Sequence, residues 1–346
     1  MIKGLLSLLL ILSLAVPVQA LELTAPEVPE SGRDIMPEKT GSFPDALGEL
    51  LRKSLELLHP DFTEAAQIGF GILFSAMIFS LIPLFARRTQ SAMNVTAAAA
   101  ISSMMFQHTN SMIVCASDTV MEICEYGKLL CPVMTAALAA QGGVTGSSAL
   151  YMGTTAFVTL LSMLVSRVII PMIYLFLAFS VAYCALEEEV MKKFAEAMKS
   201  VLSWLLKTLL IIFTAYMSIT GVISGTTDAA ALKTAKLAIS TAVPVVGGIL
   251  SDASESLLVS MAMVKNAAGI YGILAVLAVF MGPFLKIGVQ YLLLKATSLI
   301  CSFFADKNIS ALLEHFSSAM GILLATVAAG CVMVLFSTVC YMKGLG

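Results

Sequence analysis

The chain has 346 residues, of which 59% are hydrophobic and 12% are charged, and its formal net charge is −2. Soluble domains carry about 25% charged residues, so this composition excludes a soluble globular protein and predicts an all-α, polytopic integral membrane protein. The chain has no basic stripe that could neutralise phosphates, so nucleic acid is not an expected partner. Its predicted surroundings are membrane lipid.

Residues 1–20 have the three parts of a secretory signal peptide. Lys3 precedes an apolar run from Leu5 to Val16, and a small-residue cleavage motif ends at Ala20. An uncleaved membrane anchor is the alternative, but the apolar run is shorter than the about 20 residues that a span requires. In either case the chain from Leu21 onward is predicted to lie outside the cytoplasm.

Residues 21–64 form a Pro-rich, acidic extracytoplasmic segment, and we expect its first half to be mobile because this composition does not favour a packed core. An amphipathic helix is predicted from Asp45 to Leu58, where Glu49 precedes Lys53 by four residues. This helix either lies on the membrane surface or docks on a partner. Its predicted apolar face consists of Leu47, Leu51, Leu55 and Leu58.

Residues 65–346 are predicted to form a multi-span membrane domain with amphipathic surface helices. The first clear span, Ala65–Ala86, is followed by Arg87 and Arg88, and basic flanks mark the cytoplasmic side of a span. The run Ile287–Phe304, which contains a lysine, and two weaker runs bring the expected number of spans to seven to nine. The other strong runs are Gly146–Ser166, Val168–Leu186, Thr208–Thr227, Ala267–Leu285 and Phe316–Met342, and the two weaker runs are Val95–Val114 and Leu129–Gln141.

Charge positions predict how these spans are oriented. In Glu187–Lys199, acidic residues precede basic residues by four positions, which favours a helix lying on the cytoplasmic surface, and Trp204 beyond it suits an interfacial anchor. The next span leads outward, so Asp228–Lys265 is expected outside unless part of it re-enters the bilayer. Lys286 and Lys343 are then expected on the cytoplasmic side, the latter if Ile287–Phe304 crosses outward.

Residues that would carry chemistry are sparse. The seven cysteines contain no C-x-x-C pair, the three histidines are far apart, and no phosphate-loop, serine-hydrolase or zinc-protease motif occurs. We therefore expect neither a metal nor a cofactor, and an enzyme is the least favoured function. Asp228 and Asp252 are the nearest candidates for an intramembrane protease, but neither lies within a long apolar run.

Lys295 is the clearest anomaly, because it falls at the centre of the apolar run Ile287–Phe304. An ammonium group at the centre of a span costs about 3 kcal/mol on insertion scales. Lys295 either lines a pore or forms an ion pair, or its helix is displaced so that the side chain reaches the membrane surface. A carboxylate partner, Glu314 or Asp306, would decide between these readings.

The segment 221–272 replaces the surrounding hydrocarbon with small residues and placed charges. A short Ala-rich helix is predicted to be interrupted near Pro244 and to restart as a second helix. This pattern fits either the discontinuous helices of a transport site or an outer-face amphipathic hairpin that plugs or docks, and the hairpin is favoured. The candidate packing, partner or pore residues are Gly221, Gly225, Asp228, Lys233, Lys236, Pro244, Gly247, Gly248, Asp252, Glu255, Asn266, Gly269 and Gly272, together with Lys295.

The same segment resembles the signature region of the stage III sporulation protein AE family of endospore-forming bacteria, through the order DAAALKTAKLAISTAVPVVGGILSDASESL and then KNAAGIYG. The likeness extends over the whole chain. It implies a component of the channel between mother cell and forespore, located in the mother-cell membrane around the forespore. The implied partners are other proteins of the stage III sporulation operon and a forespore protein, stage II sporulation protein Q, and a homo-oligomer is left open.

Two functional hypotheses follow. The leading one is a non-enzymatic membrane subunit of a secretion or feeding channel required for endospore formation. The alternative is a permease-like transporter in which broken helices at 221–272 bind a small solute, and the family itself has been likened to permeases. The resemblance supplies no catalytic residues and no role for any single motif residue.

Overall fold

The computed structural model describes residues 25–37, 42–81, 90–242, 247–305 and 307–343. Within these ranges the chain is helical and contains no strand, which confirms the all-α class. The elements are the short α2 (Glu30–Arg33), then α3 (Phe43–Leu81), α4 (Gln90–Ala140), α5 (Val144–Leu164), the π turn η3 (Val165–Ile169), α6 (Ile170–Leu186), α7 (Glu189–Ala242), α8 (Gly247–Cys301) and α9 (Lys307–Lys343).

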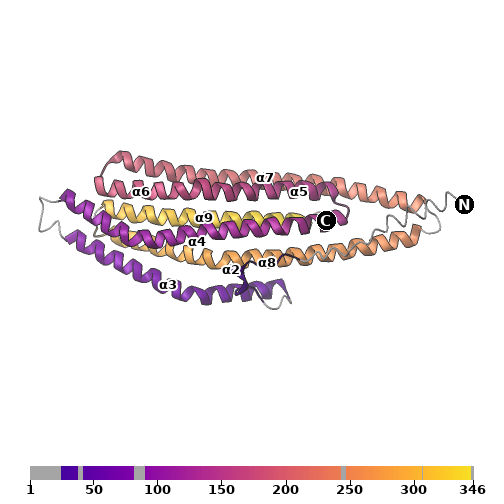
Figure 1. Cartoon of the computed structure of the whole chain (residues 1–346), viewed down its shortest axis with the longest axis horizontal. Coiled ribbons are helices and arrows are strands. Elements are labelled where there is room, and N and C mark those ends of the chain that lie inside the picture. The colour runs from indigo at the N-terminus through magenta and orange to yellow at the C-terminus, as the bar shows by residue number, and fades with distance from the viewer. Residues whose placement is uncertain (1–24, 38–41, 82–89, 243–246, 306, 344–346) are drawn as a thin grey trace.

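The long helices lie side by side in an elongated bundle, and the chain reverses direction at each turn between them, whereas α5, η3 and α6 run on in one direction as a single helix (Figure 1). The turn between α6 and α7 lies at one end, which we call the Glu187 end. The turn between α4 and α5 lies at the opposite end, which we call the Gly142 end. Both named residues have a positive φ, 58° for Glu187 and 96° for Gly142. A left-handed residue of this kind closes a helix and allows the chain to reverse.

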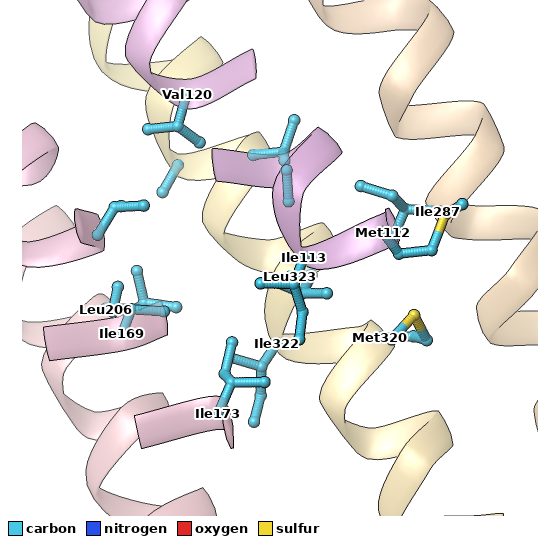
Figure 2. Close-up of a cluster of buried hydrophobic side chains, with 14 of the residues drawn as sticks. Met112, Ile113, Val120, Ile169, Ile173, Leu206, Ile287, Met320, Ile322 and Leu323 are labelled. Atoms are coloured by element: carbon cyan, nitrogen blue, oxygen red, sulfur yellow. The ribbon is translucent and has the colours of Figure 1, made fainter. Parts of the chain in front are cut away.

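α9 is the central helix, in contact with α4, α5, α6, α7 and α8. Most of its side chains are buried, as expected for a predominantly apolar helix packed among others, whereas one narrow stripe through Glu314, Ala325 and Val332 is exposed. In Figure 2, Ile322 and Leu323 of α9 meet Ile173 of α6 and Ile113 of α4. Thr326 donates to the carbonyl oxygen of Ile322 at 2.8 Å, so its buried hydroxyl does not lack a partner.

The outer surface of the bundle is apolar. Phe70 of α3 is 71% exposed, Ile211 of α7 is 68% exposed and Leu292 of α8 is 64% exposed. Such side chains would promote aggregation of a soluble protein, but they are well solvated by lipid tails. This surface is therefore suited to hydrocarbon.

Six helices within the described residues are long and apolar enough to cross a membrane, which confirms the polytopic class. The number is lower than seven to nine because three pairs of apolar runs are each one continuous helix. Charged residues interrupt hydropathy without interrupting the backbone hydrogen bonds of a helix. The joined runs are Val95–Val114 with Leu129–Gln141 as far as Ala140 in α4, Gly146–Ser166 with Val168–Leu186 in α5 and α6, and Ala267–Leu285 with Ile287–Phe304 as far as Cys301 in α8.

These joined helices change the expected orientation of α9. The joined runs in α4 and in α5–α6 each remove one expected crossing of the membrane, and two fewer crossings leave the orientation of the later helices unchanged. The Glu187 turn and the end of α7 at Ala242 therefore still lie at opposite ends. The joined run in α8 removes one further crossing, and Lys343 lies at the Gly142 end (Figure 1). Lys343 is expected on the side of Glu187 only if Ile287–Phe304 crosses separately, and this condition is not met, because that run continues α8 and Lys286 lies within the helix rather than at its end.

Residues 25–37 pack against the bundle, contrary to the expected mobility. Val28 is 7% exposed and Ile35 is 5% exposed. A Cβ atom on Gly32 would lie 3.1 Å from Val279 of α8, so the absent side chain permits this close approach. The Ser31 hydroxyl donates to Glu122 of α4 at 2.6 Å. The segment is thus packed on α4 and α8 despite its composition.

The predicted helix Asp45–Leu58 is present, but it is the first part of α3 and continues into the first span. The predicted Glu49–Lys53 ion pair is present at 3.3 Å. The face that packs is not the leucine face: Leu50 is fully buried, whereas Leu55 is 57% exposed. The small neighbours of Leu50 on its face, Ala46 and Ser54, allow close packing.

The segment Glu187–Lys199 is not a separate surface helix, because α7 begins at Glu189 and continues into the span. Phe194 stacks on Phe179 of α6 with ring centroids 5.3 Å apart. This contact aligns the charged start of α7 with its neighbour in the bundle, so the segment extends the span instead of lying across it.

We predict that Gly153→Ala destabilises the bundle. Gly153 of α5 lies under the Tyr216 ring of α7, which a Cβ atom would overlap, and the Tyr216 hydroxyl donates to the carbonyl oxygen of Ala149 at 3.1 Å. Displacing this ring should cost about 1–3 kcal/mol and lower the thermal midpoint of the purified protein by several degrees. Gly48→Ala is the control because no atom lies within 4 Å of its Cβ position. Equal midpoints for both variants would contradict the close packing.

Candidate functional site

A hairpin formed by the end of α7 and the start of α8 projects beyond the other helices at the Gly142 end (Figure 1). A Cβ atom on Gly269 would lie 2.6 Å from Met342, the penultimate residue of α9. α8 begins at Gly247, 22 residues earlier. At 1.5 Å per residue, the hairpin extends about 33 Å past the end of α9.

Most of the predicted site residues lie in this projecting hairpin. Their helical backbone is described but their side chains are not, and Pro244 lies outside the described residues. The expected short Ala-rich helix is the last part of α7, and Gly221 and Gly225 do not break it. α7 ends at Ala242 and α8 starts at Gly247, on either side of Pro244. The residues in helices are Gly221, Gly225, Asp228, Lys233 and Lys236 in α7, and Gly247, Gly248, Asp252 and Glu255 in α8.

The base of the hairpin is held by two glycines of α8. Gly269 and Gly272 are buried, and a Cβ atom on Gly272 would lie 2.5 Å from Leu130 of α4. These absent side chains let α8 approach α4 and α9 closely. Asn266 is exposed on the same helix. The two glycines therefore have a packing environment, whereas Asn266 is available at the surface.

Lys295 forms an ion pair between α8 and α9, with its Nζ atom 2.8 Å from the Oε1 atom of Glu314. Both side chains are half-exposed, at 51% and 54%. Lys295 lies six residues before Cys301, where α8 ends, or about 9 Å from that end. The ammonium is thus paired and close to the Glu187 end, and it does not occupy the centre of a span.

A polar groove lies between α4 and α6, with a volume of about 900 Å³. The Tyr174 hydroxyl donates to the Oδ1 atom of Asn110 at 2.6 Å. Ser102 is buried, and its hydroxyl has no hydrogen-bond partner in the described part of the chain. Ser103 and Gln107 also line this groove. In the sequence, these polar residues lower the hydropathy of a predicted span. Their spacing is a further signal, because Ser103, Gln107 and Asn110 are four and three residues apart and therefore lie on one helical face.

No group of three or more metal-ligating side chains occurs among the residues that the structure describes. His108 contacts Glu64 of α3 at 3.4 Å, and His315 contacts the Ser180 hydroxyl of α6 at 2.9 Å. Each of these histidines joins two helices of the bundle. The described surfaces can therefore pack against helices, form hydrogen bonds and attract charged groups, and these interactions suit assembly with other molecules and ligand binding.

These features define a helical, polytopic membrane protein with a projecting two-helix hairpin. The family model of stage III sporulation protein AE matches residues 33–344. The chain therefore belongs to the stage III sporulation protein AE family, as the segment 221–272 indicated. Stage III sporulation protein AE of Bacillus subtilis (strain 168) is 20% identical over 292 residues, a match that covers 78% of this chain and 72% of the relative. No solved structure matches the chain.

We predict that Glu314→Gln weakens the joint between α8 and α9. The pair is half-exposed, so the expected loss is about 0.5–1 kcal/mol, measured as the thermal midpoint in detergent. The charge exchange Lys295→Glu with Glu314→Lys should recover most of the loss. If the thermal midpoint of the charge-exchanged double variant is no higher than those of the single variants, the pair contributes no favourable interaction.

Proposed function

We propose that the chain is a non-enzymatic membrane subunit of the channel between mother cell and forespore that endospore formation requires. Membership of the stage III sporulation protein AE family carries this proposal, because it assigns the chain a role in sporulation. The subunit would lie in the mother-cell membrane around the forespore. Its partners would be other proteins of the stage III operon and the forespore protein, stage II sporulation protein Q.

The proposed orientation follows from charge. Arg87 and Arg88 fall between α3 and α4, whose adjoining ends lie at the Glu187 end. Basic residues beside spans favour the cytoplasm, so the Glu187 end would be cytoplasmic and the hairpin would project outward. In this arrangement residues 1–20 are a signal peptide, 21–64 are extracytoplasmic and 65–346 are the membrane domain. The hairpin would then face the space between the two membranes, where a forespore partner can be reached.

Two surfaces support the role of a subunit. The hairpin extends about 33 Å beyond α9, at 1.5 Å for each of the 22 residues before Gly269, and offers both of its helices to a partner. The polar groove presents Ser103 and Gln107 from an apolar helix. Hydrocarbon cannot bond these groups, whereas a neighbouring membrane helix with hydroxyl or amide side chains can. The groove therefore suits another membrane subunit or a second copy of this chain.

A permease-like transporter is the second candidate, and the polar groove is the observation that favours it. A volume of about 900 Å³ is sufficient for a small solute, and a few hydroxyl and amide groups would orient it. However, the interruption between α7 and α8 lies at the tip of the hairpin, not within the bundle. The proposed alternative therefore no longer rests on broken helices inside the membrane.

We predict that a shortened hairpin loses its partners while the bundle stays folded. Removing residues 236–242 from α7 and 247–253 from α8 shortens each helix by about two turns, or about 10 Å, and keeps the helical faces in place. Co-purification with the stage III operon proteins and stage II sporulation protein Q should fall about tenfold, which corresponds to about 1.4 kcal/mol. The thermal midpoint should not change, because the contacts of Gly269 with α9 and of Gly272 with α4 are outside the deleted segments.

A matched variant separates the length of the hairpin from its sequence. It replaces the same two segments with Ala-, Glu- and Lys-containing helices of equal length. Unchanged co-purification of the shortened protein would refute the proposed docking role. Solute uptake by vesicles that contain only the purified wild-type chain would support the transporter instead, since a channel subunit should be inert without its partners.

A further inference from the structure

A second groove, which we call the basic groove, lies between α7, α8 and α9 towards the Glu187 end and has a volume of about 370 Å³. It is separate from both the hairpin and the polar groove. Its polar lining residues are three lysines and four hydroxyl-bearing residues. They are Lys199, Lys207, Lys295, Ser203, Tyr291, Ser317 and Ser318.

The basic groove carries an excess of positive charge. Lys295 pairs with Glu314, and Lys199 donates to the Ser318 hydroxyl at 3.0 Å. Within the described ranges, Glu314 is the only carboxylate that forms an ion pair with any of these lysines. Three ammonium groups and one carboxylate leave two positive charges in excess. Their mutual repulsion would be relieved by a bound anion, which would interact with all three lysines.

The groove continues from its lysines onto an apolar wall formed by Leu206, Leu210 and Ile322. Trp204, three residues before Lys207 on α7, is 61% exposed. Exposed tryptophan on a spanning helix is typical of the boundary between headgroups and hydrocarbon. The groove therefore has cations beside an apolar wall close to this boundary.

We propose that the basic groove binds an anionic phospholipid, with its phosphate among Lys199, Lys207 and Lys295 and one acyl chain against the apolar wall. Basic pockets between membrane helices are suited to anionic headgroups. A free phosphate would use the lysines but not the adjoining leucines, so the combined lining favours a lipid. The bound lipid would join α7 to the α8–α9 pair.

The test uses the purified full-length chain and two lipids, phosphatidylglycerol and phosphatidylcholine, titrated in detergent and counted by native mass spectrometry. The wild-type chain should prefer phosphatidylglycerol. The double variant Lys199→Gln with Lys207→Gln retains the Lys295–Glu314 pair and should bind phosphatidylglycerol about 30-fold more weakly, from the contribution of two lysines near a membrane surface.

The control double variant is Lys193→Gln with Lys307→Gln. Both lysines are exposed near the Glu187 end, and neither lines the basic groove. This variant removes the same charge and should bind within about threefold of wild type, since long-range attraction to an exposed lysine is screened by salt. An equal loss in both double variants would mean diffuse attraction and would overturn the site.

A third variant tests the location without removing charge. A Cβ atom on Gly321 would lie 3.2 Å from the Tyr291 ring, and Gly321 lines the groove, so Gly321→Leu should fill it and weaken phosphatidylglycerol binding. Unchanged binding by a folded Gly321→Leu protein would overturn the location. Displacement of the lipid by millimolar inorganic phosphate would show a free-anion site, and absence of a preference in the wild type would overturn the proposal.

Discussion

The bundle depends on the burial of α9. A helix that is apolar over most of its circumference needs neighbours on most sides, and α4, α5, α6, α7 and α8 supply them. The hydroxyls of α9 do not oppose this burial, because Thr326, Ser337 and Thr338 each bond to a carbonyl oxygen four residues earlier. α3 is packed outside this group, mainly on α8. The order of layers thus follows from the burial of most of the α9 surface.

Much of this architecture is predictable from composition and local pattern. The apolar runs predict a helical membrane protein, Pro244 marks the interruption between α7 and α8, and Glu314 is one of two carboxylates that the sequence offers to Lys295. The continuity of α4, α5–α6 and α8 is not predictable in the same way. Hydropathy measures the preference of side chains for lipid, whereas continuity depends on backbone hydrogen bonds that Arg167 and Lys286 leave intact.

The candidate surfaces also differ in how far they can be predicted from the sequence. The segment 221–272 can be recognised because its residues are contiguous and differ in composition from their surroundings. The polar groove and the basic groove cannot, since each is formed by helices distant in sequence: Asn110 meets Tyr174, and Lys199 meets Ser318. Their individual residues are ordinary, and only the lateral packing of the helices gives them a shared environment. Packing against α8 likewise selects Leu50 rather than the more conspicuous leucine face of α3.

The π turn between α5 and α6 has a consequence for how this helix tolerates changes in length. The Ile170 N–H bonds to the Val165 carbonyl oxygen, five residues earlier, so the turn holds one residue more than an α-helical turn. Each residue advances an α-helix by about 100°. Losing one residue within the turn would leave a regular α-helix with the buried side chains Val158 and Ile173 still directed into the core, whereas a loss elsewhere would rotate one half away from it. The π turn thus accommodates one extra residue locally. As a result, the buried faces of the two halves of this 43-residue apolar helix stay aligned.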